Sequence, residues 1–337
     1  MESLRVGIIG LGIMGSAHAR FINESVPDAR VTALADMDSV RISQISRDLD
    51  GQVGLFSNAE EFFADAPVDA FIIASPDALH VPHLELALIR RLPTLCEKPI
   101  ATNVLEARQI AKRIRRVESD AGKTFIHFGF MRRFDPSYLE VKRLIASGEF
   151  GAPLFVRSST RNVRSVGITT EGLLSNIAVH DFDVLRWLFS SEWESVSISY
   201  PRSSSLGPEG LADPIMFTAK MESGILVSAD IVANNNYGYD VRTEVVCERG
   251  SIEIGIHGDV ITRTKHFAGV NRGGAMDDNW IPKFTPAYIS ELQNWVAGIQ
   301  TGQPHPDLAT ADDALLAAEA VELGLQNLRN RMLAESA

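Results

Sequence analysis

The chain has 337 residues, 45% of them hydrophobic and 22% charged. This length suits about two globular domains, and the composition excludes a largely disordered or collagen-like chain. The 32 Lys and Arg residues against 43 Asp and Glu residues give a formal net charge of −11, which disfavours nucleic acid and anionic membranes as partners.

Nearly continuous apolar runs alternate with stretches of helical length in the first third of the chain. The runs lie at 6–9, 31–35, 70–74 and 125–128, and the helical stretches at 39–49, 82–91 and 103–121. Such runs are typical of parallel strands that helices cover on both faces. This order predicts an α/β, doubly wound Rossmann sheet over residues 1–128.

The pattern changes after Gly129, where apolar and polar residues alternate, as they do over 196–200, 241–248 and 252–256. A period of two predicts half-buried strands of a largely antiparallel, open sheet. Residues 202–210 read as a loop, and 287–299 and 311–328 as helices. We expect an α+β domain over 129–337, with its C-terminal helices packing back on the first domain.

The sequence Gly10-Leu11-Gly12-Ile13-Met14-Gly15 follows the first predicted strand and opens a helix. Glycines at this spacing allow a tight turn and a close approach of the backbone to a pyrophosphate, which the helix N-terminus then attracts. Asp36 follows the second strand, where a carboxylate can accept hydrogen bonds from ribose hydroxyls. Because the next residue is Met37 and not Arg, we predict NAD and not NADP as the cofactor.

Residues near the ends of the next strands can also face the cofactor. Glu97 and Lys98 follow a fifth predicted strand, at the sheet edge where ligands bind in this architecture. Lys98 can donate to a substrate oxygen, or can be a surface lysine paired with Glu97. Ser75, Pro76 and His80 are expected to border the cofactor. His80 and His83 lack further ligands nearby, so no metal is predicted.

A third group of polar residues lies at helical spacing. Asn176, His180 and Asp183 share one face of a predicted helix, so that an amide and a carboxylate flank an imidazole. Such partners can fix the tautomer of a catalytic histidine, although a single histidine can also be structural.

Taken in this order, the glycine motif, Asp36, Glu97-Lys98-Pro99 and the His180-x-x-Asp183 motif resemble the family of glucose-fructose oxidoreductase and inositol dehydrogenase. The resemblance covers nearly the whole chain. The segments 129–135, 184–188 and 237–240 are most similar to inositol 2-dehydrogenases.

The resemblance implies an NAD-dependent oxidation of a ring hydroxyl to a ketone, and an open sheet that supports a homodimer or homotetramer. It implies that Lys98 and His180 are the catalytic acid and base, with Asn176 beside them. The residues that it places at a polyol substrate are Lys98, Met131, Arg132, Asn162, Asn176, His180 and Tyr239.

One residue departs from the family pattern, because inositol dehydrogenases usually carry Asp where this chain has Asn176. A carboxylate only accepts hydrogen bonds, whereas an amide also donates them. A pyranose sugar or sugar derivative is therefore an alternative substrate to a cyclitol. An alternative of another class is a dinucleotide-binding sensor without turnover.

The expected location is the cytoplasm. Cys96 and Cys247 are 151 positions apart and form no CxxC pair, which indicates a reducing compartment. The first residues form no export leader, and no run reaches the ~18 apolar residues of a membrane span.

Overall fold

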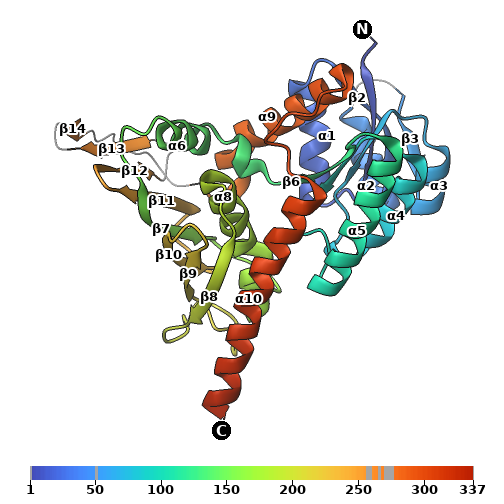
Figure 1. Ribbon diagram of the computed structural model, residues 1–337. Helices are drawn as coiled ribbons and strands as arrows, with labels where there is room; N and C mark the ends of the chain where they lie inside the picture. The colour runs from blue at the N-terminus through green and yellow to red at the C-terminus, as the bar shows by residue number, and fades with distance from the viewer. Residues whose placement is uncertain (1, 50–51, 256–259, 265–266, 269–276, 337) are drawn as a thin grey trace. The chain divides into compact units, whose positions relative to one another are not determined.

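The computed structural model describes residues 2–49, 52–255, 260–264, 267–268 and 277–336 (Figure 1). The chain divides into two compact units. The first contains Met1–Met131 and Ala287–Ala318, and the second contains Arg132–Pro286 and Glu319–Ala337.

The first unit is built on a parallel sheet of six strands in the order β3-β2-β1-β4-β5-β6. The strands are β1 (Leu4–Ile9), β2 (Ala29–Ala35), β3 (Gly54–Phe56), β4 (Ala70–Ile73), β5 (Thr94–Glu97) and β6 (Ile126–Gly129). The crossover helices are α1 (Ile13–Ser25), α2 (Ser39–Arg47), α3 (Ala59–Asp65), α4 (His80–Arg90), which a 3₁₀ turn over Asp77–Leu79 precedes, and α5 (Val104–Ala121). The order reverses between β1 and β4, which is where this architecture binds ligands.

The predicted apolar runs form the buried strands of this sheet. Every residue of β4, β5 and β6 is buried, as expected of strands with helices on both faces. The edge strand β3 was not predicted, because its three residues are too few to show a period.

Side chains from the loops cap several of these helices. Asp38 accepts hydrogen bonds from the backbone N–H groups of Val40 and Arg41 at the start of α2. Asn58 and Asn103 cap α3 and α5 in the same way. These caps satisfy backbone donors that a helix N-terminus leaves without an intrahelical partner.

The second unit is built on a sheet of eight strands in the order β14-β13-β12-β11-β7-β10-β9-β8, antiparallel except for the pair β7 and β10. The strands are β7 (Pro153–Arg161), β8 (Trp193–Ser199), β9 (Ile215–Met221), β10 (Leu226–Val232), β11 (Asp240–Cys247), β12 (Gly250–Ile254), β13 (Val260–Thr264) and β14 (Phe267–Ala268). The helices are a 3₁₀ turn over Met131–Phe134, α6 (Pro136–Ala146), α7 (Thr170–Gly172), a π-helix over Leu173–Ala178, α8 (Val179–Phe189), α9 (Trp280–Thr301) and α10 (Ala311–Ser336). The last two helices each contribute to both units.

Helices cover one face of this sheet and leave the other more exposed. Along β8 and β11, which cover two of the segments with a predicted period of two, buried residues alternate with more exposed ones, and this confirms the half-buried strands inferred there. The strand β9, which was not predicted, shows the same alternation. Gly324 of α10 packs close to Leu174 of the π-helix and Ile198 of β8. On the opposite face Met216 and Leu226 are exposed. The predicted fold class is thereby confirmed; Ile256, which the period also included, lies outside the described residues.

Candidate functional site

The glycines in the turn between β1 and α1 let other backbone atoms approach closely and leave open space at Gly12. A Cβ on Gly10, where φ is +84°, would lie 2.4 Å from the backbone of Ser75, and one on Gly15 would lie 1.8 Å from the Gly10 carbonyl oxygen. Gly12, which precedes α1, has open space around it. No side chain caps α1 and its first turn holds no acid, so its N-terminus can receive an anion.

Asp36 is fixed by backbone donors at the end of β2. Its carboxylate accepts hydrogen bonds from the N–H groups of Leu11 at 2.7 Å and Asp38 at 2.9 Å. The guanidinium of Arg41 lies 3.5 Å from the carboxylates of both Asp36 and Asp38. Arg41 was not predicted here, because only the adjacent residue, Met37, is visible as a neighbour of Asp36 in the sequence, whereas the first turn of α2 brings Arg41 back toward the carboxylate.

A cavity of about 670 Å³ opens along the carboxyl ends of the strands in the first unit. Of the predicted cofactor residues, those that line it are Gly10, Gly12, Ile13, Met14, Asp36, Ser75, Pro76, His80, Glu97 and Lys98. Gly15 is not in the lining and instead allows the turn to close against Gly10. The lining also contains residues that sequence reasoning did not assign there, among them Arg41, Ser57, Asn58, Asp77 and His83. These residues lie just after a strand or in the first turns of a helix at the same edge of the sheet. Only that position in the chain could have indicated from the sequence that they line the cavity.

Glu97 is buried at the end of β5, and His18 of α1 approaches it with Nε2 2.8 Å from Oε1. Burial pushes the pKa of Glu97 upward, but the hydrogen bond with His18 and the charges of Lys98 and His80 lower it overall. A Cβ on Gly129 would come within 3.2 Å of the Glu97 carboxyl group. Glu97 is therefore an internal anchor beside Lys98, and Lys98 itself is half-buried in the cavity lining.

Two histidines of α4 meet the loop that follows β4. His80 contacts the carbonyl oxygens of Ser75 and Pro99, and Nδ1 of His83 lies 2.9 Å from the Ser75 hydroxyl. Burial and the charge of His80 lower the pKa of His83 to about 4, so its ring is neutral near pH 7. Among the described residues no cluster of three or more His, Cys, Asp or Glu side chains could hold a metal ion.

The predicted substrate residues of the second unit include a buried charged pair. Nη1 of Arg132 lies 3.2 Å from Asp181, and its Nη2 donates to the hydroxyl of Thr160 at 3.2 Å. Tyr239 is buried against this guanidinium, and burial raises the pKa of its phenol to about 12 although Arg132 opposes the shift. Asp181 was not singled out from the sequence. The buried pair fixes Arg132 and Tyr239 side by side.

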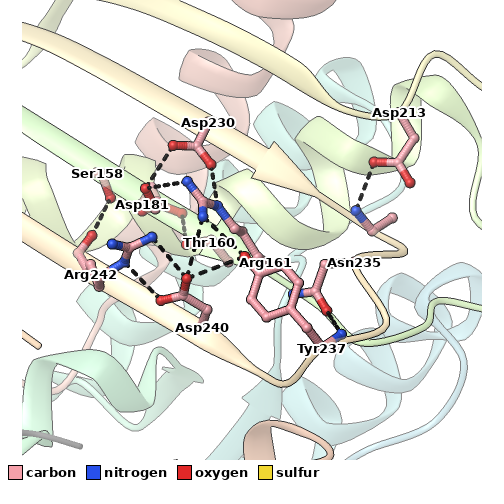
Figure 2. A network of polar contacts seen from close by, with 12 residues as sticks. Ser158, Thr160, Arg161, Asp181, Asp213, Asp230, Asn235, Tyr237, Asp240 and Arg242 are labelled. Atoms are coloured by element: carbon pink, nitrogen blue, oxygen red, sulfur yellow. Dashed lines mark hydrogen bonds and ion pairs between the residues drawn. The ribbon is translucent and has the colours of Figure 1, made fainter. Parts of the chain in front are cut away.

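Tyr237 belongs to a different group from Tyr239. Its hydroxyl accepts a hydrogen bond from Arg161 at 3.0 Å, and Arg161 also donates to Asp230 at 2.6 Å (Figure 2). Asp240 adds a contact to the same guanidinium. Because Tyr237 is exposed and Tyr239 is packed against Arg132, only Tyr239 lies with a predicted substrate residue.

The segment with Asn176 and His180 is not the uniform helix that was expected. Residues Leu173–Ala178 form a π-helix and α8 begins at Val179, so the prediction that Asn176 shares one α-helical face with His180 is wrong. His180 and Asp183 both lie in α8, three positions apart, as predicted. Asn176 is exposed, His180 is half-buried and Asp183 is buried. The Asp183 carboxylate accepts two hydrogen bonds from Arg133.

The remaining predicted substrate residues lie in different places. Met131 is buried at the end of the first unit, and Asn162, which follows β7, donates its amide to the Ser165 hydroxyl. Lys98 belongs to the first unit and His180 to the second. The convergence of Lys98 and His180 beside a bound nicotinamide stays a prediction.

Residues 4–121 match the model of an oxidoreductase family with an NAD-binding Rossmann fold, and residues 138–253 match the GFO/IDH/MocA C-terminal domain. Inositol 2-dehydrogenase 4 of Saccharopolyspora erythraea is 36% identical over 325 residues, which cover 96% of this chain and 93% of that protein. Inositol 2-dehydrogenase of Mycolicibacterium smegmatis is 36% identical over 334 residues, covering 97% and 94%.

A solved structure extends the similarity to three dimensions. The myo-inositol dehydrogenase of Lactobacillus casei, crystallised with NAD(H) and myo-inositol, superposes with a TM-score of 0.87 at 28% identity and covers 97% of this chain and 95% of its own. The similarity therefore spans both units.

Proposed function

Because the chain belongs to the Gfo/Idh/MocA family of NAD-binding oxidoreductases, we propose that it oxidises one secondary ring hydroxyl of an inositol-type cyclitol to a ketone. The chain is a dehydrogenase that acts on CH–OH groups with NAD as cofactor. The observation that carries the cyclitol assignment is the similarity, over nearly the full length, to proteins named inositol 2-dehydrogenases.

The residues of the first unit fit NAD. The open, uncapped start of α1 at Gly12 suits the pyrophosphate, and Asp36 at the end of β2 suits the ribose hydroxyls. When bound, NAD supplies the acceptor for the hydride that leaves the carbinol carbon. Asp36 follows β2 and Lys98 follows β5, so the two residues lie on either side of the central strands β1 and β4. With the ribose at Asp36, the nicotinamide would extend toward Lys98.

In the proposed mechanism, His180 takes the proton of the reacting hydroxyl while Lys98 donates a hydrogen bond to the developing alkoxide. The two groups can exchange these roles. Support for Lys98 comes from its position in the cavity lining directly after β5, next to the buried anchor Glu97. Support for His180 comes from its place at the start of α8, directly after the π-helix, a form often found at functional sites.

Substrate recognition would involve Met131, Arg132, Asn162, Asn176 and Tyr239. Arg132 and Tyr239 supply a fixed guanidinium and a protonated phenol, which can orient ring hydroxyls. Asn176 favours a second candidate function, the oxidation of a pyranose sugar or sugar derivative, because an amide can donate as well as accept.

Catalysis is tested by following NADH absorbance with NAD and a panel of inositols, glucose, galactose and xylose. NADH formation with an inositol is expected. A clear preference for a pyranose would support the second candidate, and no reduction with any polyol would support a non-catalytic dinucleotide-binding sensor.

The protein is proposed to be a cytoplasmic homodimer or homotetramer. Cys96 and Cys247 are free thiols, and none of the described helices is long and apolar enough to span a membrane. The open face of the second sheet carries the exposed side chains of Met216 and Leu226. On that face Asp230 and Asp240 pair with Arg161 and Arg242 (Figure 2), so a second copy that covered it would bury paired and not isolated charges. Sedimentation of Leu226→Asp, with Ile89→Asp on α4 as the control, tests this assembly.

A further inference from the structure

His80, at the start of α4, has a protein contact at each of its two ring nitrogens. Its side chain is buried, and both ring nitrogens face backbone carbonyl oxygens. Nδ1 lies 2.6 Å from the oxygen of Pro99, and Nε2 lies 2.9 Å from the oxygen of Ser75.

The two carbonyl contacts determine how many protons the imidazole ring of His80 needs. A carbonyl oxygen only accepts hydrogen bonds, and a neutral imidazole has one N–H and one nitrogen lone pair. In either neutral tautomer, one lone pair would point at a carbonyl oxygen. Turning the ring over would place carbon atoms against both oxygens. Only an imidazolium, which has two N–H groups, satisfies both contacts.

The surroundings of His80 can compensate this charge. Two carboxylates belong to the surroundings of His80. One is Glu97, whose pKa the charge of His80 helps to lower, and the other is Asp77, in the 3₁₀ turn directly before α4. His83, one turn along α4, is neutral near pH 7, and Lys98 is the other cation in this part of the cavity lining. Glu97 also contacts His18.

The two carbonyls belong to the loops that matter for the reaction. Pro99 directly follows Lys98, and the backbone of Ser75 lies where a side chain on Gly10 would clash, so that Ser75 abuts the phosphate-binding turn. A ring that donates to both carbonyls therefore ties the Lys98 loop to the turn that receives the cofactor.

We propose that His80 is a positioning residue whose two ring N–H groups donate to the carbonyls of Pro99 and Ser75 and so hold Lys98 in register with the bound dinucleotide. This role rests on the proposed function of Lys98. It differs from direct cofactor binding, because both ring nitrogens are already engaged by the protein.

The charge of His80 is tested first without any turnover. Long-range ¹H–¹⁵N correlation spectra of the ¹⁵N-histidine-labelled full chain near neutral pH, with His80→Asn for assignment, report the protonation of each ring nitrogen. Two protonated nitrogens at His80 are expected. A neutral tautomer would overturn the proposal, whether or not the protein oxidises a polyol.

The positioning role is tested by chemical rescue of His80→Gly. The turnover number should fall at least about tenfold, since a misplacement of ~1 Å at a reacting group can cost about 10²-fold. Imidazole, whose cation has two N–H groups, should restore much of this loss, whereas 1-methylimidazole, whose cation has one, should not. His305→Gly, which removes a partly exposed histidine outside the cavity lining, serves as the control for unspecific effects of imidazole.

The outcomes of the rescue separate the two proposals. Unchanged turnover in His80→Gly, or equal rescue by the two imidazoles, would overturn the positioning role. If His80→Gly does not fold, the spectra of the unmodified chain still decide the charge of His80. Failure of the wild-type chain to form NADH with every polyol would instead count against the proposed function.

Discussion

The guanidinium of Arg133 and the carboxylate of Asp183 form a buried, two-point ion pair, with Nε 2.9 Å from Oδ2 and Nη2 2.5 Å from Oδ1. Both side chains are almost fully inaccessible to solvent. Asp183 therefore uses both carboxylate oxygens to hold Arg133 and connect α8 to the turn before α6.

Removing one partner of this pair should destabilise the second unit strongly. Asp183→Asn removes the carboxylate charge that pairs with the buried guanidinium of Arg133, which costs about 3–5 kcal/mol of unfolding free energy. Urea denaturation followed by circular dichroism measures the loss. Glu140→Gln, which breaks the exposed pair with Arg143, is the control and should leave the midpoint nearly unchanged. Equal midpoints for Asp183→Asn and wild type would contradict the importance of the buried pair.

Removing the ammonium group of Lys98 should slow catalysis. Lys98→Ala is expected to lower the turnover number by at least about 10², the smaller contribution of a placed acid or base group. Steady-state NADH formation gives the value, and Lys112→Ala on the exposed side of α5 is the control. Near-normal turnover in Lys98→Ala would remove Lys98 from the mechanism.

The amide of Asn176 should influence substrate choice. Asn176→Asp replaces a group that donates and accepts by one that only accepts, so either the acidic limb of the pH profile or the polyol preference should shift. The ratio kcat/KM over the substrate panel and over pH measures both. Asn176→Ala distinguishes the loss of the amide from the gain of charge. If profile and preference both stay as in wild type, position 176 lies outside the active site.

The carboxylate of Asp36 should reject NADP while Arg41 beside it favours a phosphate. Asp36→Ser is expected to raise kcat/KM for NADP relative to NAD by about tenfold or more, because a repulsion between like charges is removed. Adding Arg41→Ala to this variant should cancel most of the gain. A cofactor preference that neither change alters would show that the ribose lies elsewhere.

Acid should destabilise the first unit through His127. Burial lowers the pKa of His127 from 6.5 to about 4, so between these values the unfolded chain binds a proton that the folded chain does not. The unfolding free energy therefore falls as the pH drops through this window, by up to about 3 kcal/mol from this residue. Urea titrations at a series of pH values should show a smaller fall for His127→Asn. An identical pH dependence in both proteins would contradict the burial of a neutral ring.

Local motifs allowed much of the first unit to be predicted. The spacing of Gly10, Gly12 and Gly15 after a predicted strand is visible in the sequence, although only the tertiary structure shows that Gly10 makes room for the backbone of Ser75. Asp36 follows a buried strand whose apolar pattern is also visible in the sequence. In the second unit the period of two predicted the open sheet. The π-helix before His180 could not be predicted, because residues of the same types also fit an ordinary α-helix.

The sequence by itself determined the buried strands of the first unit, the helices between them and the glycine turn after β1, since these depend on neighbours along the chain. Only the tertiary structure decided which side chains are partners. His18 meets Glu97 across 79 positions, and Arg133 meets Asp183 across 50. Folding removes both groups of such a pair from water, so each needs a hydrogen-bond partner inside the protein. The packing of distant elements decides which partner that is, and a local sequence pattern does not show it.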